Sequence, residues 1–183
     1  AWLGRASVTF FVWGRRRVTD GNGDLTSLVY SALSFGVAVG SDVGVDNWAA
    51  KIHKGSVRLD RPMVCAMGYN GLFVLGGLTG LYLATLAINQ HIHATYFVVA
   101  HFHYIMVGGT VLAFLGGLHF WWPKFTGRMY SEPWGRVSAL LIFLGFNVTF
   151  FPQFILGYLG MPRRYATYPA EFQLLNVLSS AGA

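Results

Sequence analysis

The sequence predicts an all-α protein, a polytopic bundle of transmembrane helices. Hydrophobic residues make up 54% of the 183 residues, and charged residues make up only 11%, against roughly 25% in a typical soluble domain. No charged residue occurs in the 62 residues from Pro62 to Pro123, or in the 26 residues from Val137 to Pro162. A water-soluble domain could not cover its surface over such stretches, so we expect the chain to lie in a lipid bilayer.

Three stretches are long enough to cross the bilayer, because a hydrocarbon core about 30 Å thick needs roughly 20 apolar residues in a helix. They are Met63–Ile88, Thr95–Trp122 and Val137–Gly160. Pro152 lies inside the third and predicts a kink. A weaker candidate is Leu25–Gly40, which is short, rich in Gly and Ser, and bounded by Asp24 and Asp42.

The rest of the composition narrows the class of protein. Apolar runs at both ends, 1–13 and 172–183, lead us to expect a piece of a longer chain. Cys65 is the single cysteine, so neither an internal disulfide nor a thiolate metal cluster is expected. The net charge of +6 lies in loops rather than on one face, which argues against a nucleic-acid partner. No Ser–His–Asp set, phosphate-binding glycine loop or carboxylate pair indicates hydrolytic chemistry.

The loops between these spans predict the topology. Segments 51–61 and 124–136 share one side and together hold seven Lys and Arg residues. Segments 89–94 and 161–171 share the other side and hold two, Arg163 and Arg164. The positive-inside rule places the more basic side in the cytoplasm or its equivalent. His91, His93, Arg163 and Arg164 are therefore expected to face outward.

Two histidines, His101 and His103, lie inside the predicted helix Thr95–Trp122. A polar ring in the bilayer is costly unless it is paired or ligated, which makes it a candidate functional group. Residues two apart on a helix point about 200° apart, so the two rings face opposite sides and cannot easily share one metal. Two separate cofactors could each take one imidazole as an axial ligand, and haem iron accepts this ligand readily.

Simpler interpretations remain for each of these residues. His101 and His103 could be buried hydrogen-bond partners of neighbouring helices. Arg163 and Arg164 could be interfacial anchors, although paired guanidinium groups also suit the carboxylates of haem propionates. His93 could bind a surface metal or cap the helix. His53 and His119 are isolated, and we expect solvated and core roles for them.

Several runs of residues resemble subunit I of the haem–copper terminal oxidases, the cytochrome c oxidase family. The runs are His93-Ala94-Thr95-Tyr96-Phe97-Val98-Val99-Ala100-His101-Phe102-His103-Tyr104, Phe150-Phe151-Pro152-Gln153, Gly160-Met161-Pro162-Arg163-Arg164-Tyr165, Trp122-Pro123-Lys124, and Thr126-Gly127-Arg128-Met129-Tyr130. The similarity is dense from about Trp48 to Ala183. The resemblance implies that the chain is part of the 12-helix fold of this subunit.

The resemblance also implies a role for each matching residue. His101 would be the axial ligand of a high-spin haem, where oxygen binds opposite a copper ion. His103 would be an axial ligand of a low-spin haem, with Phe102 between the two haems. Arg163 and Arg164 would hold haem propionates. His93 would help to bind a magnesium or manganese ion.

The chain departs from the family pattern at its beginning. The family's Val-Trp-x-His-His run supplies two copper ligands, but Arg15, Arg16 and Arg17 follow Val12-Trp13-Gly14, and a guanidinium has no lone pair for copper. Ala94 replaces the Asp that follows the magnesium-site His, and Gly44 stands where a proton-channel Lys is expected. We interpret residues 1–47 as a diverged or frame-shifted segment before a haem-binding part, 48–183. An intact reading frame through codons 15–47 would contradict the frame shift.

For the whole protein, the resemblance implies the catalytic subunit of a respiratory terminal oxidase. Electrons would pass from cytochrome c through subunit II, two a-type haems and a copper to O2, which becomes water while protons cross the membrane. The expected partners are subunits II and III, with cytochrome c or a quinol as donor, in a bacterial plasma membrane or mitochondrial inner membrane. We do not expect this chain alone to be active.

Other functions remain open at this point. A non-catalytic haem-binding membrane subunit fits if Arg15–Arg17 are genuine, and a quinol-oxidising member of the superfamily would keep nearly all the matching residues. A transporter or scaffold with structural histidines would hold no haem. The nitric oxide reductase branch ranks lower because it lacks the Gly-Met-Pro-Arg-Arg-Tyr run.

Overall fold

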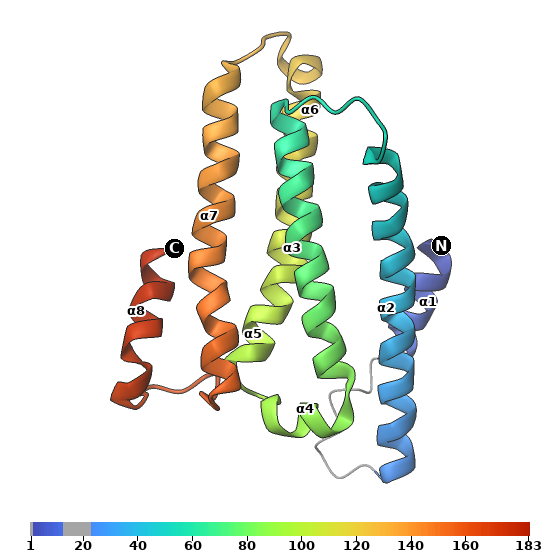
Figure 1. Cartoon of the computed structure of the whole chain (residues 1–183), viewed down its shortest axis with the longest axis vertical. Coiled ribbons are helices and arrows are strands. Elements are labelled where there is room, and N and C mark those ends of the chain that lie inside the picture. Colours follow the sequence, from blue (N-terminus) through green and yellow to red (C-terminus); the bar gives the residue numbers. More distant parts are fainter. Residues whose placement is uncertain (1, 13–22) are drawn as a thin grey trace. The chain divides into compact units, whose positions relative to one another are not determined.

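The computed structural model describes residues 2–12 and 23–183, and over these residues the chain is helical, with no β-strand (Figure 1). The elements are α1 (Trp2–Phe11), α2 (Asp24–Ile52), α3 (Arg61–Ala84), α4 (Leu86–Ile92), α5 (Tyr96–His103), the π-helix η2 (Tyr104–Val111), α6 (Leu112–Thr126), α7 (Glu132–Tyr158), the 3₁₀ turn η3 (Ala170–Phe172) and α8 (Gln173–Ala181). Within this described part, four helical segments are long and apolar enough to cross a membrane. They are α2, α3, α7 and the continuous stretch from α5 to α6. The predicted all-α transmembrane class is confirmed.

The chain divides into two compact units, and α3 contributes to both. The first unit comprises Ala1–Ser56 and Gly77–His93. Its longest element, α2, carries a polar stripe on one face: Ser27 and Ser34 are buried, and the Ser31 hydroxyl donates a 2.6 Å hydrogen bond to the carbonyl of Ala84. This stripe attaches α2 to the last residue of α3, because serines four and three residues apart share a helix face.

The second unit comprises Val57–Gly76 and Ala94–Ala183, and here α7 packs against α5 and α8. Its core contains six buried residues from α3, α5, η2, α6 and α7: Leu72, Ala100, Tyr104, Leu112, Phe146 and Phe154. Glycines let α3 approach η2 closely. A Cβ at Gly108 would lie 2.9 Å from Cβ of Leu72, and one at Gly76 would lie 2.9 Å from Cδ1 of Ile105. Small residues at such contacts are typical of helices packed in membranes.

The weakest predicted span, Leu25–Gly40, was too short. The helix α2 runs from Asp24 to Ile52 and contains Asp42 and Asp46, both of them exposed. Aspartate costs only about 0.7 kcal/mol in a helix interior, so two such residues do not end a helix. The helix ends where His53 takes an extended conformation, just before Gly55.

The predicted span Met63–Ile88 ends earlier than expected. Thr85 is extended (φ −72°, ψ 117°), so α3 stops at Ala84, and the short helix α4 follows over Leu86–Ile92. The Thr85 hydroxyl donates to the carbonyl of Leu81 at 3.1 Å. A threonine side chain that bonds to the backbone in this way competes with continued helix formation.

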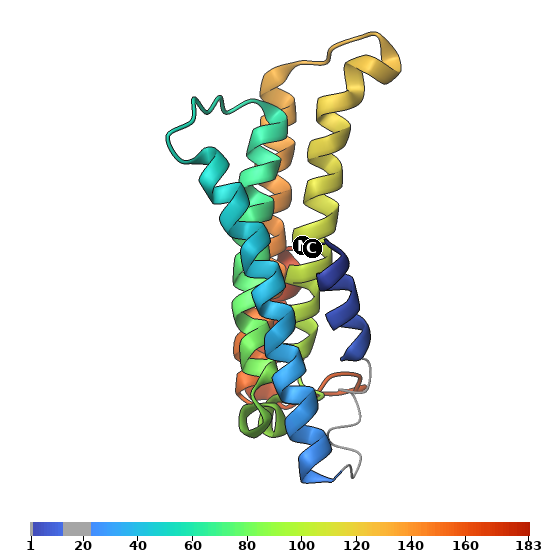
Figure 2. The same ribbon diagram turned by 90° about the vertical axis from the view of Figure 1, so that its right-hand side faces the viewer.

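The other two spans are longer than predicted at the basic side. The helix through α5, η2 and α6 passes Trp122 and Pro123 and ends at Thr126, where Gly127 adopts a left-handed conformation (φ 67°). The next helix, α7, begins at Glu132 and stays continuous through Pro152 to Tyr158. Residues 127–131 connect the two helices (Figure 2). The π-helix η2 was not predicted, because the spacing of hydrophobic residues does not distinguish a π-helical turn from an α-helical one.

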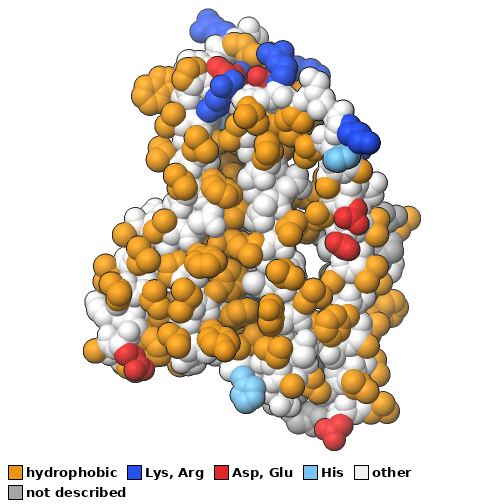
Figure 3. All heavy atoms as spheres, in the orientation of Figure 1, with side chains coloured by type: hydrophobic (Ala, Val, Ile, Leu, Met, Phe, Trp, Pro, Cys, Tyr) orange, Lys and Arg blue, Asp and Glu red, His pale blue; other side chains and the backbone are white. Residues whose placement is uncertain are grey.

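The surface of the second unit agrees with a membrane environment. Hydrophobic side chains cover the visible face of α7 and α8, and basic side chains gather at the end where α3 and α7 begin (Figure 3). On α7, Leu141 is 63% exposed and Leu144 is 58% exposed. A continuous apolar face of this kind needs lipid or protein neighbours.

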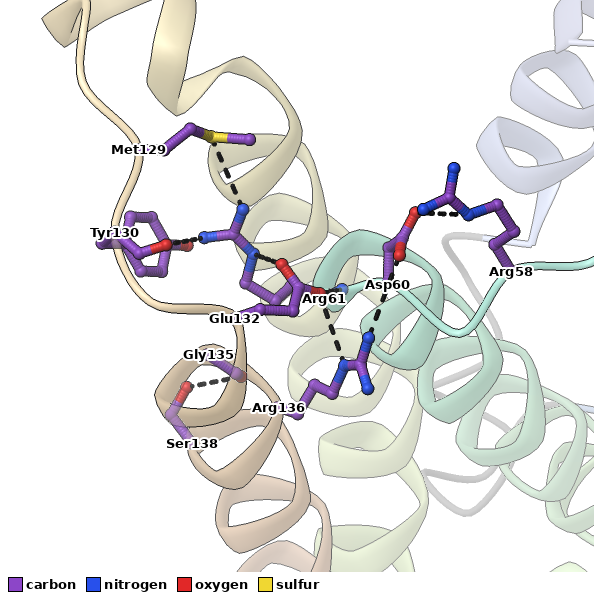
Figure 4. A network of polar contacts seen from close by, with 9 residues as sticks. All are labelled: Arg58, Asp60, Arg61, Met129, Tyr130, Glu132, Gly135, Arg136 and Ser138. Atoms are coloured by element: carbon purple, nitrogen blue, oxygen red, sulfur yellow. Dashed lines mark hydrogen bonds and ion pairs between the residues drawn. The ribbon is translucent and has the colours of Figure 1, made fainter.

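A buried arginine joins the beginning of α3 to the beginning of α7 (Figure 4). Arg61 Nε lies 2.5 Å from Oε2 of Glu132, and the Arg61 backbone N–H donates to Oε1 of the same carboxylate at 2.8 Å. The guanidinium also donates to the Tyr130 carbonyl at 3.0 Å and lies 4.3 Å from the centre of the Tyr130 ring. Segments 51–61 and 124–136 were predicted to share one side, and this contact places their ends together.

Candidate functional site: a two-histidine helix and an arginine loop

The helix that carries the two histidines begins at a threonine cap. Thr95 is extended (φ −96°, ψ 175°), and its Oγ1 accepts a hydrogen bond from the Phe97 N–H at 3.3 Å. This satisfies one of the backbone donors left open at a helix start. The cap fixes where α5 begins, and therefore which way His101 and His103 point.

The two imidazoles lie against different partners. His101 Nδ1 is 3.0 Å from the carbonyl oxygen of Gly76 in α3, whereas His103 Nδ1 is 2.8 Å from the carbonyl oxygen of Val99 in its own helix. The His103 ring stacks on Phe150 of α7, with the ring centres 4.2 Å apart and the planes 18° apart. The two-residue spacing predicted that the rings would face different sides, and they face α3 and α7.

Both imidazoles suit axial ligation of a haem iron. A carbonyl oxygen can only accept a hydrogen bond, so Nδ1 of each ring carries the proton and the lone pair lies on Nε2. A metal-ligating histidine usually donates its other N–H to such an acceptor, which fixes the tautomer and raises the basicity of the ligand. Both side chains are half-buried. The donor set of α5 therefore fits the cofactor that the sequence indicates.

A short two-stranded contact places the arginine loop beside the beginning of α5. Thr95 and Pro162 form an isolated antiparallel bridge, in which the Tyr96 N–H donates to the Met161 carbonyl at 3.0 Å and the Arg163 N–H donates to the Ala94 carbonyl at 2.9 Å. Segments 89–94 and 161–171 were predicted to share a side, and this bridge joins their ends.

The two arginines differ in their surroundings. Arg163 is half-buried, and Arg164 is exposed, with a left-handed backbone (φ 64°). In the described part of the chain, neither guanidinium has a carboxylate partner within 4.0 Å. Next to them, burial of the hydroxyl, together with Tyr96 and Tyr168, raises the pKa of Tyr165 above its ordinary value. The loop thus presents unneutralised positive charge near the start of the histidine helix, as an anionic ligand requires.

Gly157 is a site residue that the sequence analysis missed. A Cβ at this position would overlap the backbone of Phe97, because α7 and α5 touch there without a side chain between them. The contact holds the end of α7 against the first turn of the histidine helix. A glycine inside an apolar helix is a sequence signal for close helix packing, but the sequence does not show which helix the glycine contacts.

Replacing Gly157 with alanine is expected to destabilise the protein by about 3 kcal/mol or more, at the upper end of overpacking effects, since backbone rather than a flexible side chain would have to move. The measurement is thermal unfolding of the assembled protein in detergent. Gly71→Ala is the matched control: nothing lies within 4 Å of a Cβ at Gly71 in α3, so equal or higher stability is expected there. Equal effects of the two substitutions would contradict the contact.

The predicted metal residues have less support. The described residues contain no group of three His, Cys, Asp or Glu side chains that could hold a metal ion. His93 is the C-cap of α4 and is followed by Ala94 in a left-handed conformation (φ 59°); its part in a magnesium or manganese site stays a prediction. Arg15, Arg16 and Arg17, at the expected copper positions, lie outside the described residues.

His53 and His119 were expected to have a solvated role and a core role. His53 is exposed in the loop after α2. His119 is half-buried in α6, with its ring centre 5.5 Å from that of Tyr130.

Comparison with known proteins gives one consistent answer. The whole chain, residues 1–183, matches the family model described as Cytochrome C and Quinol oxidase polypeptide I. It is 41% identical over 172 residues to cytochrome c oxidase subunit 1 of Synechocystis sp., covering 94% of this chain and 31% of the relative. It is 42% identical over 185 residues to a probable quinol oxidase subunit 1 of Staphylococcus haemolyticus, covering 100% of this chain and 28% of the relative.

The fold has a counterpart among solved structures. A haem–copper terminal oxidase dimer aligns with a TM-score of 0.80 and 20% sequence identity, over 93% of this chain and 36% of that chain. The chain therefore spans about three-tenths of the length of its curated relatives. By the family match over its full length and by these identities, the chain belongs to the cytochrome c and quinol oxidase polypeptide I family.

Proposed function

We propose that this chain is the haem-holding part of subunit I of a respiratory terminal oxidase. The observation that carries the proposal is the pair of imidazoles on α5, each with Nδ1 bonded to a backbone carbonyl, His101 toward α3 and His103 beside α7. His101 Nε2 would be the axial ligand of the high-spin haem, and His103 Nε2 would be an axial ligand of the low-spin haem. Phe102 would lie between the two haems.

The chain's own residues prepare these ligands. The carbonyls of Gly76 and Val99 would hold the proton of the neutral ring on Nδ1, so that Nε2 is the nitrogen that would ligate the iron. Stacking on Phe150 covers one face of the His103 ring and shields it from solvent. When bound, the haems would supply one-electron transfer at one iron and oxygen binding at the other.

Arg163 and Arg164 would bind the haem propionates. Two adjacent guanidinium groups without carboxylate partners in the described residues can pair bidentately with carboxylates. The bridge between Thr95 and Pro162 keeps this loop at the end of α5. This bridge would thus hold the two positively charged arginines close to the helix that carries the haem-ligating histidines.

The reaction of the whole protein is proposed as electron transfer from cytochrome c to O2, with water as product and proton translocation across a bacterial plasma membrane or mitochondrial inner membrane. Subunits II and III would be the partners. A quinol is the alternative donor, because relatives of about equal identity are named as cytochrome c and as quinol oxidases. Copper would be held by residues other than Arg15–Arg17, and His93 would contribute to a magnesium or manganese site.

A non-catalytic haem-binding subunit is the second candidate. The observation that favours it is the run Arg15–Arg17 where copper ligands are expected, since arginine cannot ligate copper. Both candidates predict haem, but only the first predicts copper and oxygen turnover in the whole protein.

The deciding experiment uses the full-length protein in its assembled complex. We expect reduced-minus-oxidised spectra to show both high-spin and low-spin haem, with carbon monoxide binding to the high-spin haem and one copper per pair of haems in this subunit. Haem without copper and without oxygen consumption would favour the non-catalytic subunit. A complex in which this subunit holds no haem would contradict both candidates.

A further inference from the structure

The residue after the low-spin ligand is anchored to α7 by a buried hydrogen bond. The Tyr104 side chain is 0% exposed, and its hydroxyl donates to Oδ1 of Asn147 at 2.9 Å. The Asn147 amide in turn donates to the Phe143 carbonyl at 2.8 Å, which orients the acceptor. In a low-dielectric interior, a fully satisfied pair of this kind specifies one arrangement of the two helices.

The same turn of α7 supports the His103 ring. Phe150 is three residues after Asn147, so both lie on one face of α7. Phe150 stacks on the His103 imidazole, and the Tyr104 ring packs edge-on against Phe146 with ring centres 4.9 Å apart. One face of α7 therefore contacts both the ligand and its neighbour.

Tyr104 also stands where the helix changes type. The α-helix α5 ends at His103, and the π-helix η2 begins at Tyr104. A π-helix has more residues in each hydrogen-bonded turn, so the junction changes the direction of successive side chains. An anchor at this junction fixes the rotation of α5 relative to α7, and with it the plane of the His103 ring.

We propose that Tyr104 and Asn147 are positioning residues for the low-spin haem: their hydrogen bond holds α5 so that the His103 imidazole stays stacked on Phe150. This inference rests on the proposed haem-binding function. Neither side chain touches the iron in this scheme. Their effect acts through the orientation of the ligand ring, to which the electronic state of a haem is sensitive.

The test uses Tyr104→Phe and Asn147→Leu, alone and combined, in the assembled oxidase. Haem content is expected to stay normal, while the low-spin electron paramagnetic resonance signal and the midpoint potential of that haem shift. The double variant is expected to show about the same shift as one single variant, because the two residues act through one bond. Tyr158→Phe is the matched control, since Tyr158 is 79% exposed at the end of α7 and should change neither signal.

A second variant keeps the test decisive if Asn147→Leu reduces assembly. Phe150→Leu removes the stacked ring without touching the hydrogen bond and is expected to shift the same low-spin signal. Unchanged spectra and potential in Tyr104→Phe, with normal haem content, would overturn the inference and leave the proposed function intact. If unmodified oxidase has no low-spin haem, or if His103→Ala keeps it, the proposed function itself fails and this inference falls with it.

Discussion

Replacing His103 with alanine should remove the low-spin haem from the assembled oxidase, and replacing His101 with alanine should remove the carbon monoxide-binding haem. Loss of a group that merely supports a ligand typically costs about 10–100-fold in affinity, so removal of the ligand itself should cost more. Each substitution should affect mainly one haem, because the two rings lie against different helices. Difference spectra and haem extraction measure the outcome.

The control for these substitutions is His53→Ala. His53 is exposed in the loop after α2, and its replacement should leave both spectra unchanged. Intact spectra in both His101→Ala and His103→Ala would mean that the histidines are structural. That result would favour the transporter or scaffold interpretation over an oxidase.

The second large effect is expected at the buried arginine of the basic side. Glu132→Gln leaves the Arg61 charge in place, with its side chain only 5% exposed and without its ion-pair partner. Breaking a buried pair typically costs about 3–5 kcal/mol. Since the Glu132 carboxylate is partly exposed to water, solvent screening reduces the loss, but we still expect a clearly lower melting temperature. Thermal unfolding of the assembled protein measures this value.

Asp60→Asn provides the matched carboxylate control. Asp60 pairs with Arg58 at 3.7 Å and with Arg136 at 3.9 Å, and each of the three side chains is at least 45% exposed. Such surface pairs contribute about 0–1 kcal/mol, so the control should be nearly neutral. A loss in Glu132→Gln no larger than that in Asp60→Asn would show that the buried pair adds nothing to stability.

Much of the fold could be predicted from charge placement alone. A helix that crosses lipid needs a long stretch without charges. Such stretches identify α3 and the α5–α6 segment, and most of the predicted ends lie within a few residues of the observed ones. Because successive loops lie on alternate sides of the membrane, the sequence also predicts which helix ends lie on the same side. The Arg61–Glu132 and Thr95–Pro162 contacts join such ends. The errors lie at Thr85, where a side-chain hydrogen bond accompanies the end of α3, and in α2, which continues past the exposed Asp42 and Asp46; hydropathy reports neither.

For the candidate site, the sequence by itself determined the residue types: two imidazoles on opposite sides of an apolar helix, and an arginine pair on the outward loop. Only the tertiary structure decided their partners. The Gly76 carbonyl, the Phe150 ring and the Asn147 amide reach α5 and η2 from helices up to 47 residues away in the chain. Helical periodicity fixes a side chain's direction on its own helix, whereas the group it meets depends on the packing of several helices at once.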